Sequence, residues 1–451
     1  MELLGGTMPG TQRPKPISTK LQQIAKLARD RPGEALTAVA HHIDIEWLRE
    51  AFRRTRKDGA PGVDGVVAHD YEEDLDKNLS RLLDRAKSGT YRAPPVRRVE
   101  IPKGSGTETR PIGIPTFEDK VLQRAVTMAL EAIYEQEFVD ESFGFRPGRS
   151  AHQALDRLRE CLIKVRGGFV LELDIRRFFD TLDRGILRKF LHQRIRDGVL
   201  LRLVGKWLQA GVIHNGVRSR PSRGTPQGGV VSPLLANVYL HHVLDLWFEQ
   251  DVKPCLVGKA HLVRYADDAT LVFESESDAR RVLEVLPKRF ARFGLALHPD
   301  KTRLIDFRRP VRGLQRVAEE APLERTFVLL GFLHYWGKSR EGYPVIKRKT
   351  SKDRFRKTVR AASDWCRIHR HWPVAEQHRA LCRKLRGHDA YFGITGNFPA
   401  LHRLRQEVRR VWRKWLSRRS QRGNINWESF NALLARYPLP PPRVVHSIYR
   451  S

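Results

Sequence analysis

Apolar residues recur along the chain in two patterns, which together predict a mixture of strands and helices. Short apolar runs bounded by charged or turn residues predict strands, whereas apolar residues at helical spacing predict helices. The predicted strands are 94–102, 110–115, 169–175, 327–335 and the runs around 262–263 and 271–273, with a short hairpin at 212–217. The predicted helices are 21–39, 45–56, 71–87, 119–138, 151–165, 184–210 and 277–293, with more after 351. The pattern therefore indicates an α+β fold that ends in an all-helical region.

Two adjacent aspartates lie between apolar runs at the centre of this pattern. The sequence YADD at 265–268 is typical of a tight turn in a buried hairpin, so Asp267 and Asp268 are expected side by side at its tip. Unpaired carboxylates there repel each other and lose hydration, and a divalent cation is the usual remedy. Adjacent hard oxygen ligands suit Mg²⁺, which keeps its other positions for water and substrate phosphates. For an isolated Asp-Asp pair, a solvated surface turn is the alternative.

A second predicted strand supplies a third carboxylate. Residues 169–175 alternate toward Asp174 at the end of the strand. An acid on one strand that faces a pair on a neighbouring hairpin is the arrangement that two-metal phosphoryl transfer needs. One ion activates a hydroxyl, and the other holds a triphosphate and its leaving pyrophosphate. The ions lie roughly 3.5–4 Å apart, so we expect acids from the two elements to converge.

Several motifs, taken in order, resemble those of one enzyme family. The YADD sequence is similar to the signature of reverse transcriptases. The sequences GTPQGG at 224–229 and SPLLAN at 232–237 resemble the nucleotide-site loop and helix of bacterial group II intron reverse transcriptases/maturases, and GFRPGRS at 144–150 resembles the same family. The resemblance extends from about residue 45 to the C-terminus. Several motifs in the right order are far more specific than any one alone.

The resemblance implies the right-hand architecture of polymerases. We expect a flexible or helical N-terminal segment (1–44), an N-terminal extension with fingers (45–165), a palm with an antiparallel sheet and a fingers insertion (166–345), and an all-α thumb or maturase domain X (346–451). Many members of the family carry a C-terminal zinc-binding nuclease domain. We expect this chain to lack one, because its four cysteines are not at zinc-ligand spacing.

The resemblance also assigns a role to each acid and to one lysine. Asp174, Asp267 and Asp268 would bind two Mg²⁺ ions, for which Mn²⁺ is an expected substitute. Lys301 matches a lysine that approaches the leaving phosphates in polymerases, where an ammonium could protonate the departing pyrophosphate. A surface lysine after a Pro-Asp turn is also common, so the alternative that Lys301 is an ordinary surface residue stays open.

Further residues are expected around the incoming nucleotide. They are Lys103, Arg110, Ile175, Phe179 and Gln227. Lys103 and Arg110 bracket the predicted fingers hairpin and would hold the triphosphate, since arginine offers a bidentate fork; otherwise they merely face solvent. Phe179 would lie under the sugar and exclude a 2′-hydroxyl by volume, unless Phe178 and Phe179 are both core aromatics. Gln227 would contact the nucleotide or the templating pair.

Three loops have a predicted role in holding the nucleic acid. Glycines and a proline make 58–65 a tight loop, which by resemblance covers the template, although an ordinary turn fits the residues equally well. Arg146 and Arg149 could contact template phosphate, and a structural role for Arg146 is the alternative. The segment 330–332 resembles the primer-grip hairpin, where Gly331 would admit the primer backbone.

The charge of the chain narrows the class of partner. The formal net charge is +32, which favours an anionic partner, and nucleic acid is the natural candidate. One alternative to a nucleic-acid partner is a surface that is basic without such a role, and binding to an anionic membrane is less favoured. No long apolar stretch predicts a membrane helix, and the N-terminus has no signal-peptide core. After residue 351, arginine and lysine interleave with tryptophan at helical spacing, which suits RNA binding by a thumb in which most tryptophans form the helix–helix core.

The expected function is therefore RNA-directed DNA polymerisation, with a maturase role in RNA splicing and intron mobility. The expected partners are an RNA template (structured intron RNA), a DNA or RNA primer and dNTPs, in a reducing cytoplasm and associated with nucleoid or ribonucleoprotein. An RNA-binding splicing cofactor without polymerisation and a retron-type or defence-associated enzyme stay open as alternatives. Viral RNA-dependent RNA polymerases share the palm, but Phe179 and the context of Ala266 favour deoxyribonucleotides. The chain is expected to be a monomer or a dimer.

Overall fold

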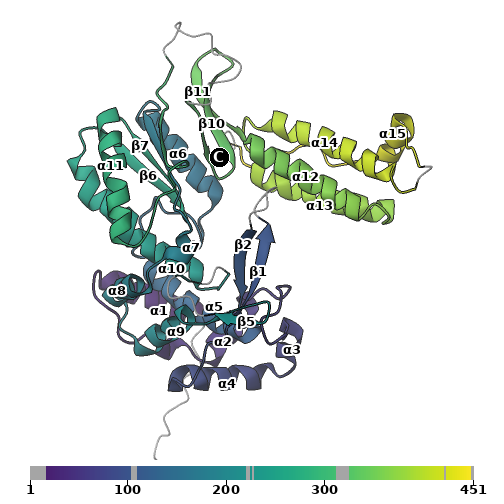
Figure 1. The fold of residues 1–451 in the computed structure, drawn as a ribbon. Helices are drawn as coiled ribbons and strands as arrows, with labels where there is room; N and C mark the ends of the chain where they lie inside the picture. The colour runs from purple at the N-terminus through teal and green to yellow at the C-terminus, as the bar shows by residue number, and fades with distance from the viewer. Residues whose placement is uncertain are drawn as a thin grey trace, which may run out of the picture.

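The computed structural model of the protein describes residues 17–102, 109–219, 224–225, 228–310, 325–420 and 423–447. Two of the predicted nucleotide contacts, Lys103 and Gln227, lie outside these residues. The described chain combines antiparallel sheets with a helical C-terminal region, which confirms the predicted α+β class. In Figure 1 the C-terminal helices extend sideways from the central sheet, and the β1–β2 hairpin stands between the two in this view.

A four-stranded antiparallel sheet carries the predicted acids. Its strand order is β6-β7-β3-β8, with β3 at Phe169–Leu173, β6 at Ala260–Tyr265, β7 at Asp268–Phe273 and β8 at Arg303–Asp306. Both faces are covered, which is why the strands read as continuous apolar runs.

The two faces of this sheet pack against different helices. Helix α11 (Glu276–Arg292) shares a core with Leu171 and Leu271, whereas α6 (Ala151–Lys164) shares a core with Val170 and Val272. Figure 1 shows α11 and α6 beside the sheet. Because side chains alternate along each strand, even-numbered residues of β3 lie on the α6 face. That face also packs against the C-terminal region through Phe332.

A second sheet forms the fingers region. Its strand order is β2-β1-β4-β5, and its strands are β1 (Val96–Pro102), β2 (Thr109–Ile114), β4 (Val212–His214) and β5 (Val217–Ser219). The helices of this half are α1 (Ile17–Asp30), α2 (Ile45–Arg54), α3 (Ala68–Glu73), α4 (Leu75–Ser88), α5 (Phe117–Tyr134), α7 (Phe178–Thr181), α8 (Arg184–Arg194), α9 (Gly198–Leu208) and α10 (Ser232–Leu240). Two π-helical segments, His241–Asp245 and Trp247–Val252, continue α10.

Several predicted elements differ from the structure. The helix expected over 21–39 is α1, which ends at Asp30. The helix expected over 119–138 spans Phe117–Tyr134, because the Thr116 side chain accepts a hydrogen bond from the Asp119 backbone N–H and caps it two residues earlier. The apolar strand expected over 327–335 is a hairpin of β9 (Phe327–Leu329) and β10 (Phe332–Lys338). Leu330 and Gly331 turn the chain between them, with φ of 53° and 82°.

The C-terminal region begins later than the sequence suggests. The expected break at 345/346 falls inside β11 (Pro344–Thr350), which pairs with β10, and helices start at Lys352. The helices are α12 (Lys352–Ile368), α13 (Val374–Phe392), α14 (Phe398–Leu416) and α15 (Trp427–Arg436). Trp412 is fully buried in their common core, Trp365 and Trp415 are half-buried, and Trp372 and Trp427 are exposed, so the tryptophans are divided between core and surface.

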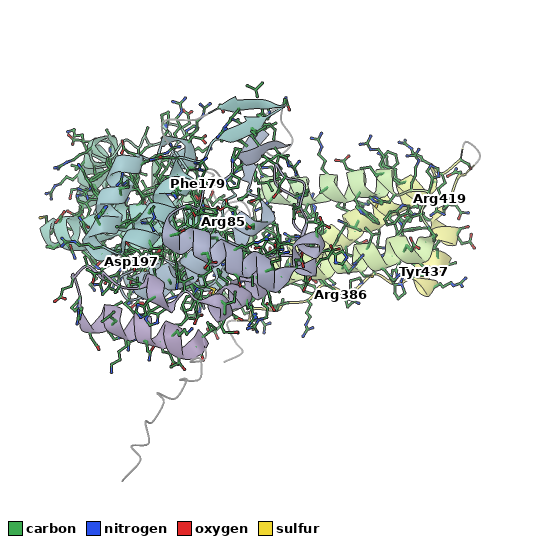
Figure 2. The ribbon with its side chains drawn as sticks, turned by 90° about the horizontal axis from the view of Figure 1, so that it is seen from below. Arg85, Phe179, Asp197, Arg386, Arg419 and Tyr437 are labelled. Carbon is green, nitrogen blue, oxygen red and sulfur yellow. The ribbon has the colours of Figure 1, made fainter. Side chains whose placement is uncertain are left out.

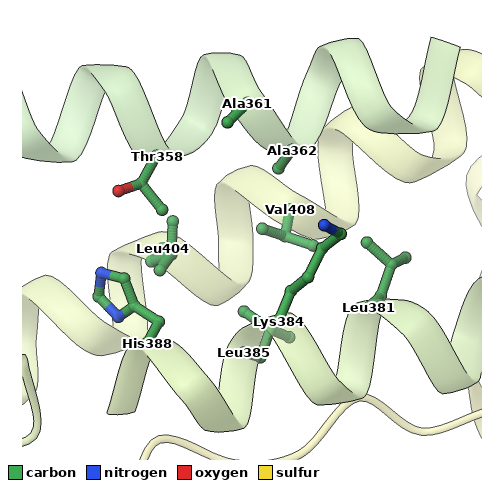
Figure 3. Close-up of a pocket in the computed structure, with 9 residues that line it drawn as sticks. All are labelled: Thr358, Ala361, Ala362, Leu381, Lys384, Leu385, His388, Leu404 and Val408. Atoms are coloured by element: carbon green, nitrogen blue, oxygen red, sulfur yellow. The ribbon is translucent and has the colours of Figure 1, made fainter. Parts of the chain in front are cut away.

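The C-terminal helices enclose a cavity, and their solvent-facing surface is strongly basic. A cavity of about 180 Å³ lies among α12, α13 and α14, lined mainly by alanine, leucine and valine side chains (Figure 3). Figure 2 shows Arg386 and Arg419 on this region, with Phe179 in the other half of the molecule. Arg386 is exposed, as are Arg356 and Arg360 on α12. The basic residues therefore form the surface of the region, and its apolar residues form a core of its own.

A buried arginine connects the N-terminal helix to the rest of the fold through hydrogen bonds. Arg194, at the end of α8, donates to the Glu137 carboxylate at 2.6 Å and to the Arg31 carbonyl at 2.6 Å. It also donates to the carbonyls of Ala28 and Glu34. The predicted N-terminal segment is therefore packed against the fingers helices from Ile17 onward.

Replacing this arginine tests its role as an anchor. We expect Arg194→Met to cost about 3 kcal/mol of unfolding free energy, because it leaves buried carbonyls and Glu137 without their donor. Arg149→Met, which breaks the pair of Arg149 with the exposed Asp140, is the control and should cost at most about 1 kcal/mol. Urea unfolding measures both, and hydrogen exchange should show early loss of protection in α1. Equal costs for the two variants would contradict the anchor.

Candidate active site

The turn between β6 and β7 holds Asp267 and Asp268 as predicted from the sequence. Tyr265 pairs with Asp268 across the hairpin, so Ala266 and Asp267 form the tip. Ala266 has a φ of 57°, in the left-handed region that an L side chain adopts at a cost. Gly144 packs directly on this tip: a Cβ there would lie 2.2 Å from the Ala266 nitrogen. The turn is therefore held in one strained conformation by its surroundings.

The register of the sheet brings the third acid to the same place. Leu173 of β3 pairs with Ala269 of β7, so Asp174, the next residue along, lies level with Asp268. Residues that are level on neighbouring strands share a face, so both acids lie on the α6 face. The Asp174 carbonyl accepts a hydrogen bond from the backbone N–H of His298 at 2.8 Å. Backbone pairing thus holds Leu173 on the β7 side and Asp174 itself on the side of His298.

Lys301 reaches the acids from the segment that follows. A turn at His298 carries it, with the Thr302 N–H donating to the His298 carbonyl at 3.0 Å. Its ammonium lies 2.8 Å from the Asp174 carboxylate. Both side chains are partly exposed, so the pair is accessible to a ligand.

The carboxylates perturb one another electrostatically. Burial among protein atoms, which removes water from the carboxylate, raises the pKa of Asp268 to about 6. The negative charges of Asp267 and Asp174 add to the rise. The positive charges of Lys301 and Arg110 oppose it. Asp268 nevertheless keeps an open face to solvent. A carboxylate that is crowded by like charges and still accessible is suited to an added cation.

The acids would need a small rearrangement to act as metal ligands. In the described part of the chain, no three His, Cys, Asp or Glu side chains are already gathered as a ligand set. Lys301 would have to leave Asp174, and the three carboxylates would have to rotate toward a common point. The donor chemistry fits a hard divalent cation, because the available ligands are carboxylate oxygens with an open face for water and phosphate.

A glycine-rich loop lies against the predicted sugar-contacting residue. Thr225 donates its backbone N–H to the Phe179 carbonyl at 2.9 Å. A Cβ at Gly224 would lie 2.6 Å from the same carbonyl. The Phe179 ring is partly exposed, whereas Phe178 is 3% exposed and lies in the core. Of the two aromatics, only Phe179 is therefore available to a ligand.

The other end of this loop touches the fingers hairpin. A Cβ at Gly228 would lie 2.4 Å from the Gly113 carbonyl of β2, the strand that carries Arg110. The loop thus spans from α7 to β2, and Arg110 is close enough for its charge to lower the pKa of Asp268. Absence of a Cβ at both glycines is what allows this close approach.

The side chains of two predicted contacts are buried. Arg146 is buried and pairs with Glu135 at 3.0 Å while donating to the carbonyls of Val139 and Ser142 at 2.7 Å, which removes it from template phosphate. The Ile175 side chain is 5% exposed in the core, so only its backbone could meet a nucleotide. Arg149 is only 29% exposed and pairs with Asp140.

Sequence reasoning missed Arg264, Asp245 and Asn237, which form a fully buried polar cluster behind the YADD turn. The signal available was an arginine inside an otherwise apolar strand. Sequence reasoning also missed Tyr391 of α13, whose hydroxyl donates to the Leu330 carbonyl at 2.9 Å. Burial raises the pKa of Tyr391, and the negative charge of Asp268 adds to this rise. The C-terminal region therefore lies near the acids.

Comparison with known proteins agrees with this geometry. The model of the family "Reverse transcriptase (RNA-dependent DNA polymerase)" matches residues 101–332, which include all three acids and Lys301. The chain belongs to the reverse transcriptase family. This family uses divalent metal ions, which fits the acidic cluster. The match confirms the resemblance that the YADD sequence indicated.

The chain is also similar to several individual proteins, two of which are named for introns. It is 43% identical over 256 residues to "Protein YkfC" of Escherichia coli, covering 55% of this chain and 66% of that protein. It is 35% identical over 232 residues to "Group II intron-encoded protein LtrA" of Lactococcus lactis, covering 51% of this chain and 38% of that protein. "Nuclear intron maturase 3, mitochondrial" of Arabidopsis thaliana is 26% identical over 43% of this chain and 31% of its own length. The matches thus span less than two thirds of each relative.

No helix within the described ranges combines the length and the apolar composition needed to cross a membrane. All four cysteines are free, three of them buried.

The raised pKa of Asp268 has a consequence for stability. Its folded pKa of about 6 exceeds the ordinary value of 3.8, so the folded state binds more protons than the unfolded state between these values. Asp268 therefore lowers stability above about pH 6, and this cost is relieved as the pH falls toward 4.

We expect Asp268→Asn, in EDTA at pH 7.5, to raise Tm by roughly 1–2 °C after allowance for solvent screening. The advantage over the wild type should shrink at pH 5. Differential scanning fluorimetry of both proteins measures the shift, with Asp76→Asn, an exposed aspartate of α4, as the control. A lower Tm for Asp268→Asn at pH 7.5 would contradict the repulsion among the carboxylates.

Proposed function

We propose that this protein is an RNA-directed DNA polymerase that extends a primer on an RNA template with dNTPs. The observation that carries the proposal is the meeting of Asp174, Asp267 and Asp268 at one end of the palm sheet. Two Mg²⁺ ions, with Mn²⁺ as a substitute, would supply activation of the primer 3′-hydroxyl and neutralisation of the leaving pyrophosphate. The three carboxylates would hold them, each acid contributing hard oxygen ligands.

Lys301 would serve as the proton donor of the reaction. Its ammonium now pairs with Asp174 at 2.8 Å, and it would turn from this carboxylate to the phosphates of the bound nucleotide. The primer 3′-hydroxyl would lose its proton to solvent water, its oxygen would bond to the α-phosphorus, and the bond from the α-phosphorus to the oxygen that bridges to the β-phosphate would break. The departing pyrophosphate would take its proton from Lys301. Lys103 and Arg110 of the fingers hairpin would hold the triphosphate.

The nucleotide would be selected by the contact of its sugar with Phe179. The ring belongs to α7 and is partly exposed, and Gly224 lies against the backbone of Phe179. A 2′-hydroxyl would clash with the ring, which costs typically ~1–3 kcal/mol and therefore roughly 10–100-fold in discrimination. Gln227 and the backbone of Ile175 would complete the pocket.

The template and primer would lie between the palm and the C-terminal helices, which we propose as the thumb. The β9–β10 hairpin would grip the primer near Gly331, which lies against Arg354 of α12 and Phe392 of α13. The exposed basic residues of α12 and α13 would hold phosphates of the duplex. The proposed domains are those expected from the sequence, with the thumb moved to start at Lys352.

A second candidate function is that of a maturase. The relatives include a group II intron-encoded protein and a nuclear intron maturase. The proposed thumb has the exposed arginines that a structured intron RNA would require. We propose that this protein also binds its intron RNA in the cytoplasm and assists splicing, which does not need the three acids.

Neutralising one carboxylate separates catalysis from RNA binding. We expect Asp267→Asn to lower primer extension on an RNA template by at least about 10³-fold, because a ligand needed in the transition state is lost. RNA affinity should stay within about twofold. Gel-based extension of a DNA primer with Mg²⁺ and filter binding measure the two, with Asp76→Asn as the control. Extension at the wild-type rate by Asp267→Asn would refute the proposal.

Removing the Phe179 ring tests sugar selection. We expect Phe179→Ala to raise the rNTP/dNTP ratio of kcat/KM by roughly 10–100-fold, since the ribose hydroxyl gains space. Single-nucleotide extension with each nucleotide measures the ratio. Phe178→Ala is the matched control: it should lower stability by about 3–5 kcal/mol as a core cavity and leave the ratio unchanged. A Phe179→Ala ratio equal to that of the wild type would remove the residue from this role.

A further inference from the structure

The tip of the YADD hairpin is strained at the residue directly before the two acids. Ala266 has a φ of 57°, a conformation in which the Cβ of an L residue crowds its own backbone. Such a residue persists only where its surroundings over-determine the backbone. Because Ala266 and Asp267 are consecutive, the orientation of the Ala266–Asp267 peptide sets the direction in which the Asp267 carboxylate points. Whatever holds Ala266 therefore also aims the acid.

One buried guanidinium holds this peptide. Arg264 is 1% exposed, and its Nη1 donates to the Ala266 carbonyl at 2.9 Å. The same nitrogen donates to the Asn237 side-chain oxygen at 2.9 Å. The Arg264 side chain thus turns back from β6 to bond the tip of its own hairpin.

The guanidinium is in turn fixed by a carboxylate. Nε and Nη2 of Arg264 donate to the two oxygens of Asp245 at 2.7 and 2.5 Å, in a bidentate pair that is 1% and 0% exposed. Asp245 ends the π-helical segment His241–Asp245, and the extra residue in that turn places its side chain behind the sheet. Local π-helical turns are frequent at functional sites.

Asn237 closes the cluster from the opposite side of the turn. Its Nδ2 donates to the Gly144 carbonyl at 2.7 Å, and Gly144 packs on the Ala266 nitrogen. The carbonyl of Ala266 is therefore held by Arg264, and its nitrogen is enclosed by Gly144. Asn237 joins the two contacts.

We propose that Arg264, fixed by Asp245 and Asn237, is a positioning residue that clamps the strained Ala266 peptide and so sets the metal affinity of the Asp267 carboxylate. This proposal rests on the proposed function, because it assumes that Asp267 is a metal ligand. Stability alone does not account for the pair, since replacing a buried ion pair by uncharged side chains of similar volume is often neutral or stabilising. The contact with Ala266 gives the pair a task that uncharged side chains cannot perform.

Binding of Mn²⁺ to the protein without nucleic acid tests the clamp directly. Mn²⁺ titrations followed by electron paramagnetic resonance would compare the wild type, Arg264→Lys, and the double variant Arg264→Met/Asp245→Asn. The double variant removes both buried charges and so protects the fold, and Arg264→Lys keeps the charge but loses the fork. Both should raise the Kd for the site that Asp267→Asn removes, by about tenfold.

A second substitution at the turn distinguishes a clamp from a merely structural pair. Glycine adopts positive φ without strain, so a turn with glycine at position 266 needs no clamp to keep its conformation. Adding Ala266→Gly to the double variant should therefore restore at least a third of the lost Mn²⁺ affinity. Loss of a structural pair would not be repaired by glycine, which loosens the hairpin further. Arg194→Met, which breaks a buried pair elsewhere, is the matched control and should leave the Kd within about twofold.

The outcomes separate the clamp from the proposed function. A wild-type Kd in both clamp variants, with binding abolished by Asp267→Asn, would overturn the clamp and leave the metal site standing. An unchanged Kd in Asp267→Asn would overturn the metal site and the clamp together. A raised Kd that Ala266→Gly does not restore would assign the pair to structure alone and also overturn the proposal.

Discussion

The structure depends on the placement of three like charges at one end of a sheet whose two faces are both buried. Backbone pairing enforces this placement: β3 and β7 are in a register that puts Asp174 level with Asp268, and the hairpin tip adds Asp267. Carboxylates so close repel each other, and this repulsion adds to the rise that burial causes in the pKa of Asp268. A fold that keeps them together against their charge has a use for a cation at that point.

The remaining elements meet the palm sheet at this point. The glycine-rich loop joins α7 to β2, so the partly exposed Phe179 ring and the strand of Arg110 are held by one segment. On the opposite side, Tyr391 and the β9–β10 hairpin connect the C-terminal helices to the α6 face of the palm sheet. Fingers, palm and helical region therefore meet around the acids, and the strongly basic composition of the chain favours an anionic partner.

The sequence predicted what depends on short-range pattern. Apolar runs that end in Asp174 and flank the YADD turn identified the palm hairpin and its neighbouring strand, because a strand's periodicity survives whatever packs on it. It did not reveal that Arg146 is buried on Glu135 or that Arg264 reaches Asp245, because such pairs join residues far apart in the chain. The apolar pattern of 327–335 predicts one strand, and only the resemblance of 330–332 to a hairpin indicates the turn, because the positive φ of Leu330 and Gly331 leaves no trace in the apolar pattern.

The central claim is that two divalent cations bind between the end of β3 and the β6–β7 turn. Anomalous diffraction from crystals of the protein with Mn²⁺, an RNA template, a dideoxy-terminated DNA primer and a dNTP measures this directly. We predict two Mn²⁺ peaks roughly 3.5–4 Å apart, bounded by the carboxylates of Asp174, Asp267 and Asp268. Mn²⁺ peaks elsewhere with none at these three acids, in a crystal where primer and nucleotide are bound, would contradict the account.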